Sequence, residues 1–299
     1  MQPNQPNQQN QQNQQNQQNQ QNQQNILFIG GGNMATALIG GILANQKQQN
    51  IKISVLEISQ IAAKSLQKKF PEITIFSFAD EISNANNFDT IFLAVKPQNL
   101  ADALQPLQKL NFWQTALIIS IVAGMTTQKI QTFLNATNLK IVRVMPNTPA
   151  LINQAMSGLF ANANVDATNK NLAQNLLSSV GKILWLNDEN QIDAITAISG
   201  SGPAYVFLFL EALQKAAQNM GFDNKQAELL ALQTMLGAAL LAKNNIDSGK
   251  DNFAQLRQKV TSKGGTTAAA LDVFFKNNFE NLVEKACQVA QQRSVELGK

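Results

Sequence analysis

A short apolar strand that runs straight into a glycine-rich turn and a helix constrains this chain more than any other feature. Residues 26–30 read ILFIG, the turn is Gly30-Gly31-Gly32, and NMATALIGGILANQ is typical of a helix. The spacing Gly30-x-Gly32-x-x-Ala35 is the fingerprint of a dinucleotide-binding βαβ unit. Its glycines let backbone approach a pyrophosphate at the helix N-terminus, and the small third residue lets helix and strand pack closely. The motif predicts a dinucleotide site, with a merely tight turn as the alternative.

The rest of the chain predicts a sheet domain followed by a helical domain. Further apolar strands are expected at 51–57, 73–78, 90–95, 116–122, 140–145, 156–162 and 182–187, with a polar helix at 60–69. Apolar strands alternating with helices favour a parallel sheet covered on both faces. From about Gln191 only helical patterns remain. The predicted fold class is α/β, with a Rossmann-type dinucleotide-binding domain at 26–188 and an all-helical domain at 189–299.

Residues 1–25 are almost wholly Gln and Asn, with six QQN triplets at 8–25. Such a tract has no apolar side chains to offset the entropy of ordering, so it is predicted to be a disordered tail. An interaction-prone or aggregation-prone tail is the alternative.

Composition excludes several classes of site and of partner. The 299 residues include no histidine, so a Ser-His-Asp triad, a Cys-His dyad and an imidazole metal ligand are all excluded. A lone Cys287 allows neither an internal disulfide nor a multi-cysteine metal site, and no metal is expected. The net charge of +4, without a basic run interleaved with aromatics, argues against nucleic acid as a partner.

The compartment and the absence of a membrane partner are also predicted from composition. No apolar stretch reaches the ~20 residues of a membrane span, and the N-terminus does not read as a signal peptide. A cytoplasmic, soluble protein without a membrane partner is therefore expected.

Other candidate cofactor contacts follow the strands, because ligands of open α/β sheets bind at the carboxyl ends of strands. Glu57 ends the second strand; a carboxylate there accepts from the ribose 2′-OH and favours NAD, although Ser59 and Lys64 nearby could serve a phosphate instead. A solvated strand end is the third possibility. The later strands end in three further polar or small segments, namely Ala94-Val95-Lys96-Pro97, Ala123-Gly124 (small enough for a flat nicotinamide ring) and the loop holding Asn147.

A third constellation lies in the helical part. Ser199-Gly200-Ser201-Gly202-Pro203-Ala204-Tyr205 opens one helix, and Val260-Thr261-Ser262-Lys263-Gly264-Gly265-Thr266-Thr267 leads into another. Two glycines and two threonines at a helix start form a nest of N–H groups and hydroxyls suited to a carboxylate. An ordinary capped helix is the alternative, and Tyr205 is expected in a helix core rather than in catalysis.

The chain lacks the proton donor that a hydroxy-acid dehydrogenase needs. There is no histidine, and the positions that carry Asn and Lys in β-hydroxyacid dehydrogenases are Val206 and Phe209 here. Reduction of an imine is less demanding, because a basic imine can arrive already protonated. A hydroxyl that orients the nitrogen would then suffice.

Taken together, these motifs resemble the pyrroline-5-carboxylate reductase family. The resemblance runs from Ile26 to the C-terminus through FIGGGNMATALIGG, LAVKPQ, VRVMPNTPA, ISGSGPAYVFLFLEAL and VTSKGGTTAAAL. It implies reduction of 1-pyrroline-5-carboxylate to L-proline with NADPH or NADH. It also implies that the helical domain is a dimerisation domain, with active sites at the interface of a homodimer that can assemble further.

The resemblance also assigns roles to single residues. Gly264, Gly265 and Thr266 would hold the substrate carboxylate through backbone amides, Thr267 would donate to the ring nitrogen as the catalytic residue, and Ser201 and Ser262 would support them. On the cofactor side it implies Gly30, Gly32, Asn33, Met34, Ala94, Lys96, Pro97, Ala123 and Gly124.

This chain departs from the family pattern at four places. Lys263 stands where many members have proline, and DSGKDNFAQLR lacks the His-Pro that often precedes Gln-Leu-Arg. Ala79-Asp80-Glu81 stands where relatives have an asparagine near the adenosine, and the QQN tail has no counterpart. The alternatives are a reductase of another cyclic imine or of a 2-oxo acid, and a dinucleotide-sensing regulator without turnover.

Overall fold

A computed structural model describes residues 23–45, 50–83 and 86–298. The chain forms two compact units. The first comprises Met1–Gly200 together with Gln291–Lys299, and the second comprises Ser201–Ala290.

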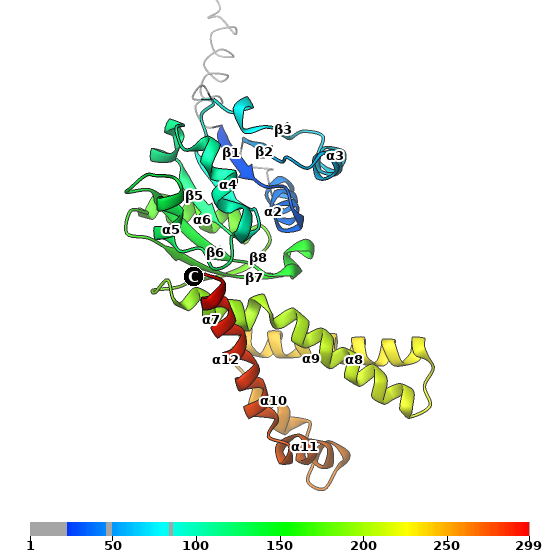
Figure 1. Ribbon diagram of the computed structural model, residues 1–299. Helices are drawn as coiled ribbons and strands as arrows, with labels where there is room; N and C mark the ends of the chain where they lie inside the picture. Colours follow the sequence, from blue (N-terminus) through cyan, green and yellow to red (C-terminus); the bar gives the residue numbers. More distant parts are fainter. Residues whose placement is uncertain (1–22, 46–49, 84–85, 299) are drawn as a thin grey trace, which may run out of the picture. The chain divides into compact units, whose positions relative to one another are not determined.

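The first unit contains an eight-stranded sheet in the order β3-β2-β1-β4-β5-β6-β7-β8. Its first six strands have the order typical of a doubly wound dinucleotide-binding sheet. The strands are β1 (Gln24–Ile29), β2 (Ile51–Leu56), β3 (Thr74–Phe76), β4 (Thr90–Leu93), β5 (Leu117–Ser120), β6 (Lys140–Met145), β7 (Ala155–Ala161) and β8 (Gly181–Trp185) (Figure 1).

The sheet is not wholly parallel, contrary to the prediction. Strands β1 to β6 pair in parallel, but β6 and β7 are antiparallel, with Val144 opposite Leu159. The connection between them is a short 3-10 turn, η6 (Thr148–Ile152), which reverses the chain without a crossover helix. Strand β8 then pairs in parallel with β7 and alternates between half-buried and exposed residues.

Helices cover both faces of this sheet, as predicted. Alternate residues of β1 enter two different cores: Phe28 packs with one and Leu27 with the other. The Phe28 ring stacks on Phe92 of β4, with ring centroids 4.4 Å apart. The helices of this unit are α2 (Asn33–Ala44), α3 (Gln60–Lys69), α4 (Leu100–Leu104), α5 (Thr127–Phe133), α6 (Ala167–Ser178) and α7 (Gln191–Ile195).

Strand β1 begins inside the tract that was predicted to be a disordered tail. The Gln24 N–H donates to the Asn50 carbonyl at 2.8 Å, and the Asn25 N–H donates to the Asp89 carboxylate at 2.8 Å. Because the backbone has partners on both sides, pairing extends two residues further than the apolar pattern suggests. The rest of the predicted tail, residues 1–22, lies outside the described residues.

The two units divide later than the sequence pattern suggests. The predicted boundary falls after residue 188, whereas the contacts divide the chain after Gly200. Helix α7 packs on the sheet, and a side chain on Gly158 of β7 would collide with Ile195 at 2.7 Å. A π-helical turn, η7 (Thr196–Gly200), follows α7 directly.

The second unit is helical but has almost no core of its own. It contains α8 (Gly202–Asn219), α9 (Asn224–Asp247), α10 (Phe253–Lys259), α11 (Thr266–Lys276) and most of α12 (Phe279–Leu297). No residue of α8, α10 or α11 is buried, and only Ala227 and Ala231 of α9 are buried. Aromatic contacts link α8 to α11 through Phe209 and Phe274, whose centroids lie 6.5 Å apart.

One helical stretch of the described residues is long and apolar enough, by length and composition, to cross a membrane. It runs over Gln191–Asn219 and joins α7, η7 and α8. The prediction that no apolar stretch reaches that length is therefore wrong, because the helix continues through the serine- and glycine-rich motif. Core helices of soluble proteins also meet this criterion.

Candidate functional site

A cleft of about 590 Å³ opens at the carboxyl ends of β1, β2 and β4. Strands β1 and β4 are neighbours although β2 and β3 lie between them in sequence, so the cleft sits where the strand order reverses. This is the position at which open α/β sheets bind nucleotides. Its lining comprises Ile29, Gly30, Gly31, Gly32, Leu56, Glu57, Ile58, Ala79, Ala94, Val95, Lys96, Asn99, Asp102, Ala103 and Pro106.

Gly30 is required at the end of β1. Its φ is +97°, and an added Cβ would lie 2.8 Å from the Ala94 carbonyl oxygen. An L-residue would be strained there and would collide with the neighbouring strand end. The glycine therefore lets the β1 and β4 ends approach each other at the floor of the cleft.

Gly32 leaves space open at the start of α2. A Cβ added there would meet no atom within 4 Å. Gly32 is the N-cap of α2, and no side chain caps the first N–H groups of this helix. An uncapped helix N-terminus beside open space fits a dinucleotide pyrophosphate, as the motif predicts. Those N–H groups belong to the first turn, which includes Asn33, Met34 and Ala35.

Glu57 joins the end of β2 to the glycine-rich loop. One carboxylate oxygen accepts the Gly31 N–H at 2.8 Å, and the other accepts the Ser59 N–H at 2.7 Å. Its carboxylate is thus held in a fixed position on the cleft lining. The Ser59 hydroxyl caps α3 instead, accepting from the Ala62 N–H at 3.4 Å.

Ala94, Val95 and Lys96 line the cleft together with a helical face that the motifs did not indicate. Pro97 begins a 3-10 turn, η3 (Pro97–Asn99), which leads into α4. The additional lining residues Asn99, Asp102, Ala103 and Pro106 follow at intervals of three, one and three residues. This spacing puts them on one face of a helical segment, and it was the signal available in the sequence.

Ala123 and Gly124, which were predicted to let a nicotinamide ring approach, lie in the turn after β5. Gly124 packs against another segment of the same unit. Gly124 has a φ of +72°, and a Cβ on it would lie 2.9 Å from the backbone nitrogen of Gly298. The end of α12 therefore packs against this turn within the first unit. Ala123 and Gly124 do not line the cleft.

Asn147 uses both polar atoms of its side chain for the backbone. Its amide N–H donates to the Ser199 carbonyl at 2.9 Å, and its oxygen accepts the Met156 N–H at 2.9 Å. The side chain is buried. In this structure Asn147 ties the end of β6 to β7 and to the π-helical turn.

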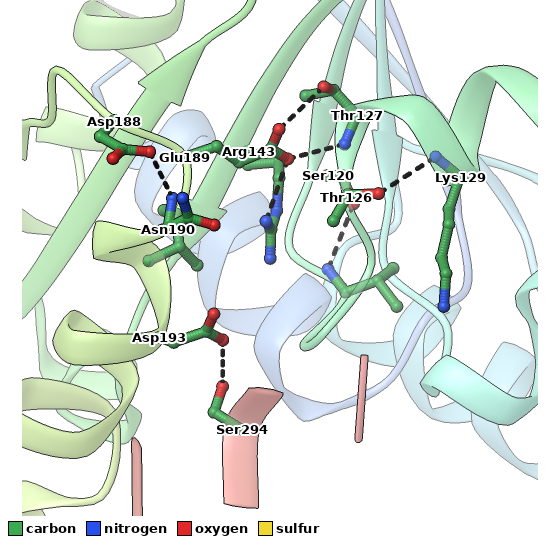
Figure 2. A network of polar contacts seen from close by, with 12 residues as sticks. Ser120, Thr126, Thr127, Lys129, Arg143, Asp188, Glu189, Asn190, Asp193 and Ser294 are labelled. Carbon is green, nitrogen blue, oxygen red and sulfur yellow. Dashed lines mark hydrogen bonds and ion pairs between the residues drawn. The ribbon is translucent and has the colours of Figure 1, made fainter. Parts of the chain in front are cut away.

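A network of hydrogen bonds around Glu189 holds the start of α5, directly after the turn that follows β5 (Figure 2). Arg143 of β6 donates to Glu189 at 3.0 Å, and both the N–H and the hydroxyl of Thr127 donate to the same carboxylate, at 2.7 and 3.1 Å. The Arg143 side chain is 6% exposed and that of Glu189 is 23% exposed. Glu189 therefore joins β6, the start of α5 and the segment that precedes α7.

The candidate substrate loop lies in the second unit, at the start of α11. Gly265 is the N-cap of α11, and no side chain caps the first backbone N–H groups of this helix, which include those of Thr266 and Thr267. Helix N-termini of this kind can bind anions. The Gly265 N–H donates to the Ser262 carbonyl at 3.1 Å, closing the turn around Gly264, whose φ is +72°. Ser201 is the N-cap of α8, and its hydroxyl makes no capping hydrogen bond.

The structure thus gathers part of the predicted set in one cleft. Of the predicted cofactor residues, six line it: Gly30, Gly32, Glu57, Ala94, Val95 and Lys96. The remaining eight are not part of that lining: Asn33, Met34, Ala35, Ser59, Pro97, Ala123, Gly124 and Asn147. Ala79, at which the sequence departs from the family pattern, is part of the lining. Among the described residues, no group of three or more acidic or cysteine side chains is placed to hold a metal ion.

Two segments of the chain match models of known protein families. Residues 25–124 match a family described as NADP oxidoreductase, coenzyme F420-dependent, and residues 189–297 match pyrroline-5-carboxylate reductase dimerisation. The pyrroline-5-carboxylate reductase of Haemophilus influenzae is 42% identical over 272 residues, which cover 91% of this chain and 97% of the relative. That of Pseudomonas aeruginosa is 43% identical, over 92% of this chain and 97% of the relative.

The chain belongs to the pyrroline-5-carboxylate reductase family.

Solved structures of this family have the same fold. A pyrroline-5-carboxylate reductase from Coxiella burnetii superposes with a TM-score of 0.81 at 40% identity, covering 92% of this chain and 99% of that one. Pyrroline carboxylate reductase from Plasmodium falciparum, solved with NADP bound, gives 0.76 at 31% identity, over 92% and 98% of the two chains. The resemblance inferred from the motifs, and the α/β-plus-helical fold class, are confirmed.

Proposed function

We propose that this protein reduces 1-pyrroline-5-carboxylate to L-proline with NADPH or NADH. The observation that carries the proposal is that a chain of this family has two uncapped helix N-termini, one in each unit. The α2 N-terminus adjoins the open space at Gly32, and the α11 N-terminus follows Gly264 and Gly265. The first suits a pyrophosphate and the second suits a carboxylate.

The substrate loop supplies selectivity. The backbone amides of Gly264 and Thr266 bind the carboxylate of the cyclic imine, because this end of α11 is the positive end of the helix dipole. The Gly265 N–H donates to the Ser262 carbonyl and so keeps the loop in shape. The Thr267 hydroxyl oxygen accepts from the protonated ring N–H and orients the imine carbon. Ser262, in the same loop, and Ser201, at the N-cap of α8, supply the supporting hydroxyls.

The dinucleotide cleft supplies the other reactant. The first turn of α2, including Asn33 and Met34, holds the pyrophosphate, and Lys96 and Pro97 flank the β4 end of the cleft. NAD(P)H held in this cleft would supply the hydride for the imine carbon. The segment Ala123-Gly124 lies at the nicotinamide end.

No protein side chain needs to deliver a proton before the hydride arrives. The imine is basic and binds in its protonated form, so the product nitrogen keeps that proton as the amine forms. The chain has no histidine that could act as a general acid. Rate enhancement then comes mainly from the proximity and orientation of the two reactants.

The position of Glu57 favours NADH over NADPH. Its carboxylate is fixed on the cleft lining by two backbone N–H groups, where it can accept from a ribose 2′-OH and repels a 2′-phosphate. Asp102 adds a second carboxylate to the same lining.

The helical unit joins two copies of the chain. Large apolar side chains of α8 and α9 are exposed, including Phe207 at 59% and Leu229 at 65%, although the unit has almost no core. Burying these helices against a second copy removes that surface from water. Burial of α8 against a second copy also explains why the stretch Gln191–Asn219 is so apolar, with no need for a membrane. A reducing cytoplasm suits the lone, half-buried Cys287.

Steady-state oxidation of NADH and of NADPH, measured in parallel with pyrroline-5-carboxylate as acceptor, tests the proposal. Turnover with the cyclic imine above that with open-chain 2-oxo acids and other cyclic imines is the expected result. Higher activity on an open-chain oxo acid would contradict the substrate assignment. Tight dinucleotide binding without any turnover would instead indicate a dinucleotide-sensing protein.

A further inference from the structure

The end of α12 docks on the turn that follows β5. The contact is between two glycines: an added Cβ on Gly298 would lie 2.5 Å from the Gly124 carbonyl oxygen, and one on Gly124 would lie 2.9 Å from the Gly298 nitrogen. Only a residue without a side chain fits at either position. The two backbones therefore pack directly on each other, although the residues are far apart in sequence.

Two polar contacts hold the end of α12 in this place. The hydroxyl of Ser294, which is 5% exposed, donates to the Asp193 carboxylate of α7 at 2.6 Å. The Lys129 ammonium of α5 donates to the Gly298 carbonyl. Figure 2 shows Ser294 directed at Asp193, with Lys129 on the far side of the β5 turn.

The other side of the same turn is fixed by the helix that it enters. Thr126 caps α5 by accepting the Lys129 N–H at 3.2 Å, and Thr127 is bound by Glu189 through both its N–H and its hydroxyl. Residues 121–126 are thus held between strand β5, the Glu189 network and the end of α12. Gly298 is therefore a direct backbone neighbour of this turn.

We infer that the segment Ser294–Gly298 is a positioning element for the nicotinamide end of the cofactor site. The inference rests on the proposed function, which places Ala123-Gly124 at that end. Strand β5 neighbours β4, whose carboxyl end lines the cleft, so the turn after β5 is at the same edge of the sheet. None of these residues touches a reacting atom; they act by fixing the turn.

The decisive variant is Gly298→Ala, because its methyl group would lie 2.5 Å from the Gly124 carbonyl oxygen and would force the two backbones apart. The kcat with pyrroline-5-carboxylate should fall about tenfold, since small misplacements of a reactant reduce rates strongly. The Kd of ADP-ribose, which has no nicotinamide, should stay within about twofold. The emission of bound NADH should change, because its nicotinamide environment changes.

A second pair of variants tests the Ser294 anchor without adding bulk. Asp193→Ala removes the acceptor and should reproduce the kcat loss, whereas Asp193→Asn keeps an acceptor oxygen and should restore most of the activity. Gln292→Ala is the matched control, because its side chain lies on the same helix and donates to Glu296 at 3.3 Å in an exposed position. It should behave as the unmodified chain does.

The outcomes separate this inference from the proposed function. Unchanged kcat and unchanged NADH emission in both Gly298→Ala and Asp193→Ala would overturn it. So would a parallel loss of ADP-ribose affinity or a large fall in Tm, because these report damage to the whole unit. If the unmodified chain does not reduce pyrroline-5-carboxylate, the proposed function fails, yet the comparison of NADH with ADP-ribose still decides the inference.

Discussion

The Glu57 carboxylate accepts the Gly31 N–H at 2.8 Å, so one side chain both lines the dinucleotide cleft and holds its glycine-rich loop. The second oxygen accepts the Ser59 N–H at 2.7 Å. Removing the whole side chain would therefore disturb the loop as well as the charge. A substitution that keeps the shape removes the charge and retains one of the two hydrogen bonds to the loop.

Glu57→Gln should raise the ratio of kcat/KM for NADPH to that for NADH by about tenfold, or roughly 1.4 kcal/mol. The amide keeps one acceptor oxygen for the loop but removes the charge that repels a 2′-phosphate. Parallel steady-state kinetics with the two cofactors measure the ratio. Glu72→Gln, at an exposed carboxylate outside the cleft lining, is the matched control. An unchanged ratio would remove Glu57 from cofactor selection.

Gly32→Ala should weaken NADH binding by at least about tenfold while leaving Tm within about 2 °C. The backbone at Gly32 (φ −67°, ψ −176°) suits alanine, and the added Cβ meets no protein atom within 4 Å. The methyl group enters only the space that we assign to the pyrophosphate. Fluorescence titration with NADH and thermal unfolding measure the two effects. Normal NADH affinity in a folded variant would place the pyrophosphate elsewhere.

Thr267→Ala should lower kcat/KM for pyrroline-5-carboxylate by about 1–3 kcal/mol, the usual effect of one unmade buried hydrogen bond. Thr267→Ser keeps the hydroxyl and should retain most of the activity. Thr267 is the second residue of α11, and Thr168 holds the same place in α6, so Thr168→Ala controls for the loss of a threonine at a helix start. If Thr267→Ala has unchanged kinetics, this hydroxyl plays no part in the reaction.

The strands and the glycine-rich loop could be predicted because their determinants are local. Apolar runs such as TIFLAV and KIVRVM are buried on both faces, and each became a strand within a few residues of its predicted bounds. The antiparallel direction of β7 could not be predicted in this way, since an apolar run marks a strand but does not indicate its direction. What sets its direction is the short connection after β6.

The cleft residues that belong to a local motif could be predicted. Residues whose partners lie far away in the sequence could not. Gly30, Gly32 and Glu57 came from spacing alone, and all three line the cleft. The Asn147 side chain donates to the Ser199 carbonyl, and Gly124 contacts Gly298; both partners lie far away in the sequence. Long-range partners of this kind leave no periodic signal.

The exposed apolar surface of the helical unit is expected to bind a second copy of the chain. Leu236 and Leu240 of α9 are 47% and 51% exposed, and they lie one helical turn apart on the same face. The double variant Leu236→Glu with Leu240→Glu places two carboxylates on that face, where desolvation of charge opposes association. Sedimentation velocity should show at least a dimer for the unmodified chain and a monomer for the double variant.

Ile61→Glu is the matched control for that experiment, since Ile61 is 85% exposed on α3 of the first unit and should not change the assembly. The double variant should also lose most of its helical circular dichroism on mild heating, because α8 and α9 have almost no core without a partner. NADH binding at the sheet should survive, because the cleft lies wholly within the first unit. A double variant that still sediments as the unmodified chain does would show that this face of α9 is not part of the interface.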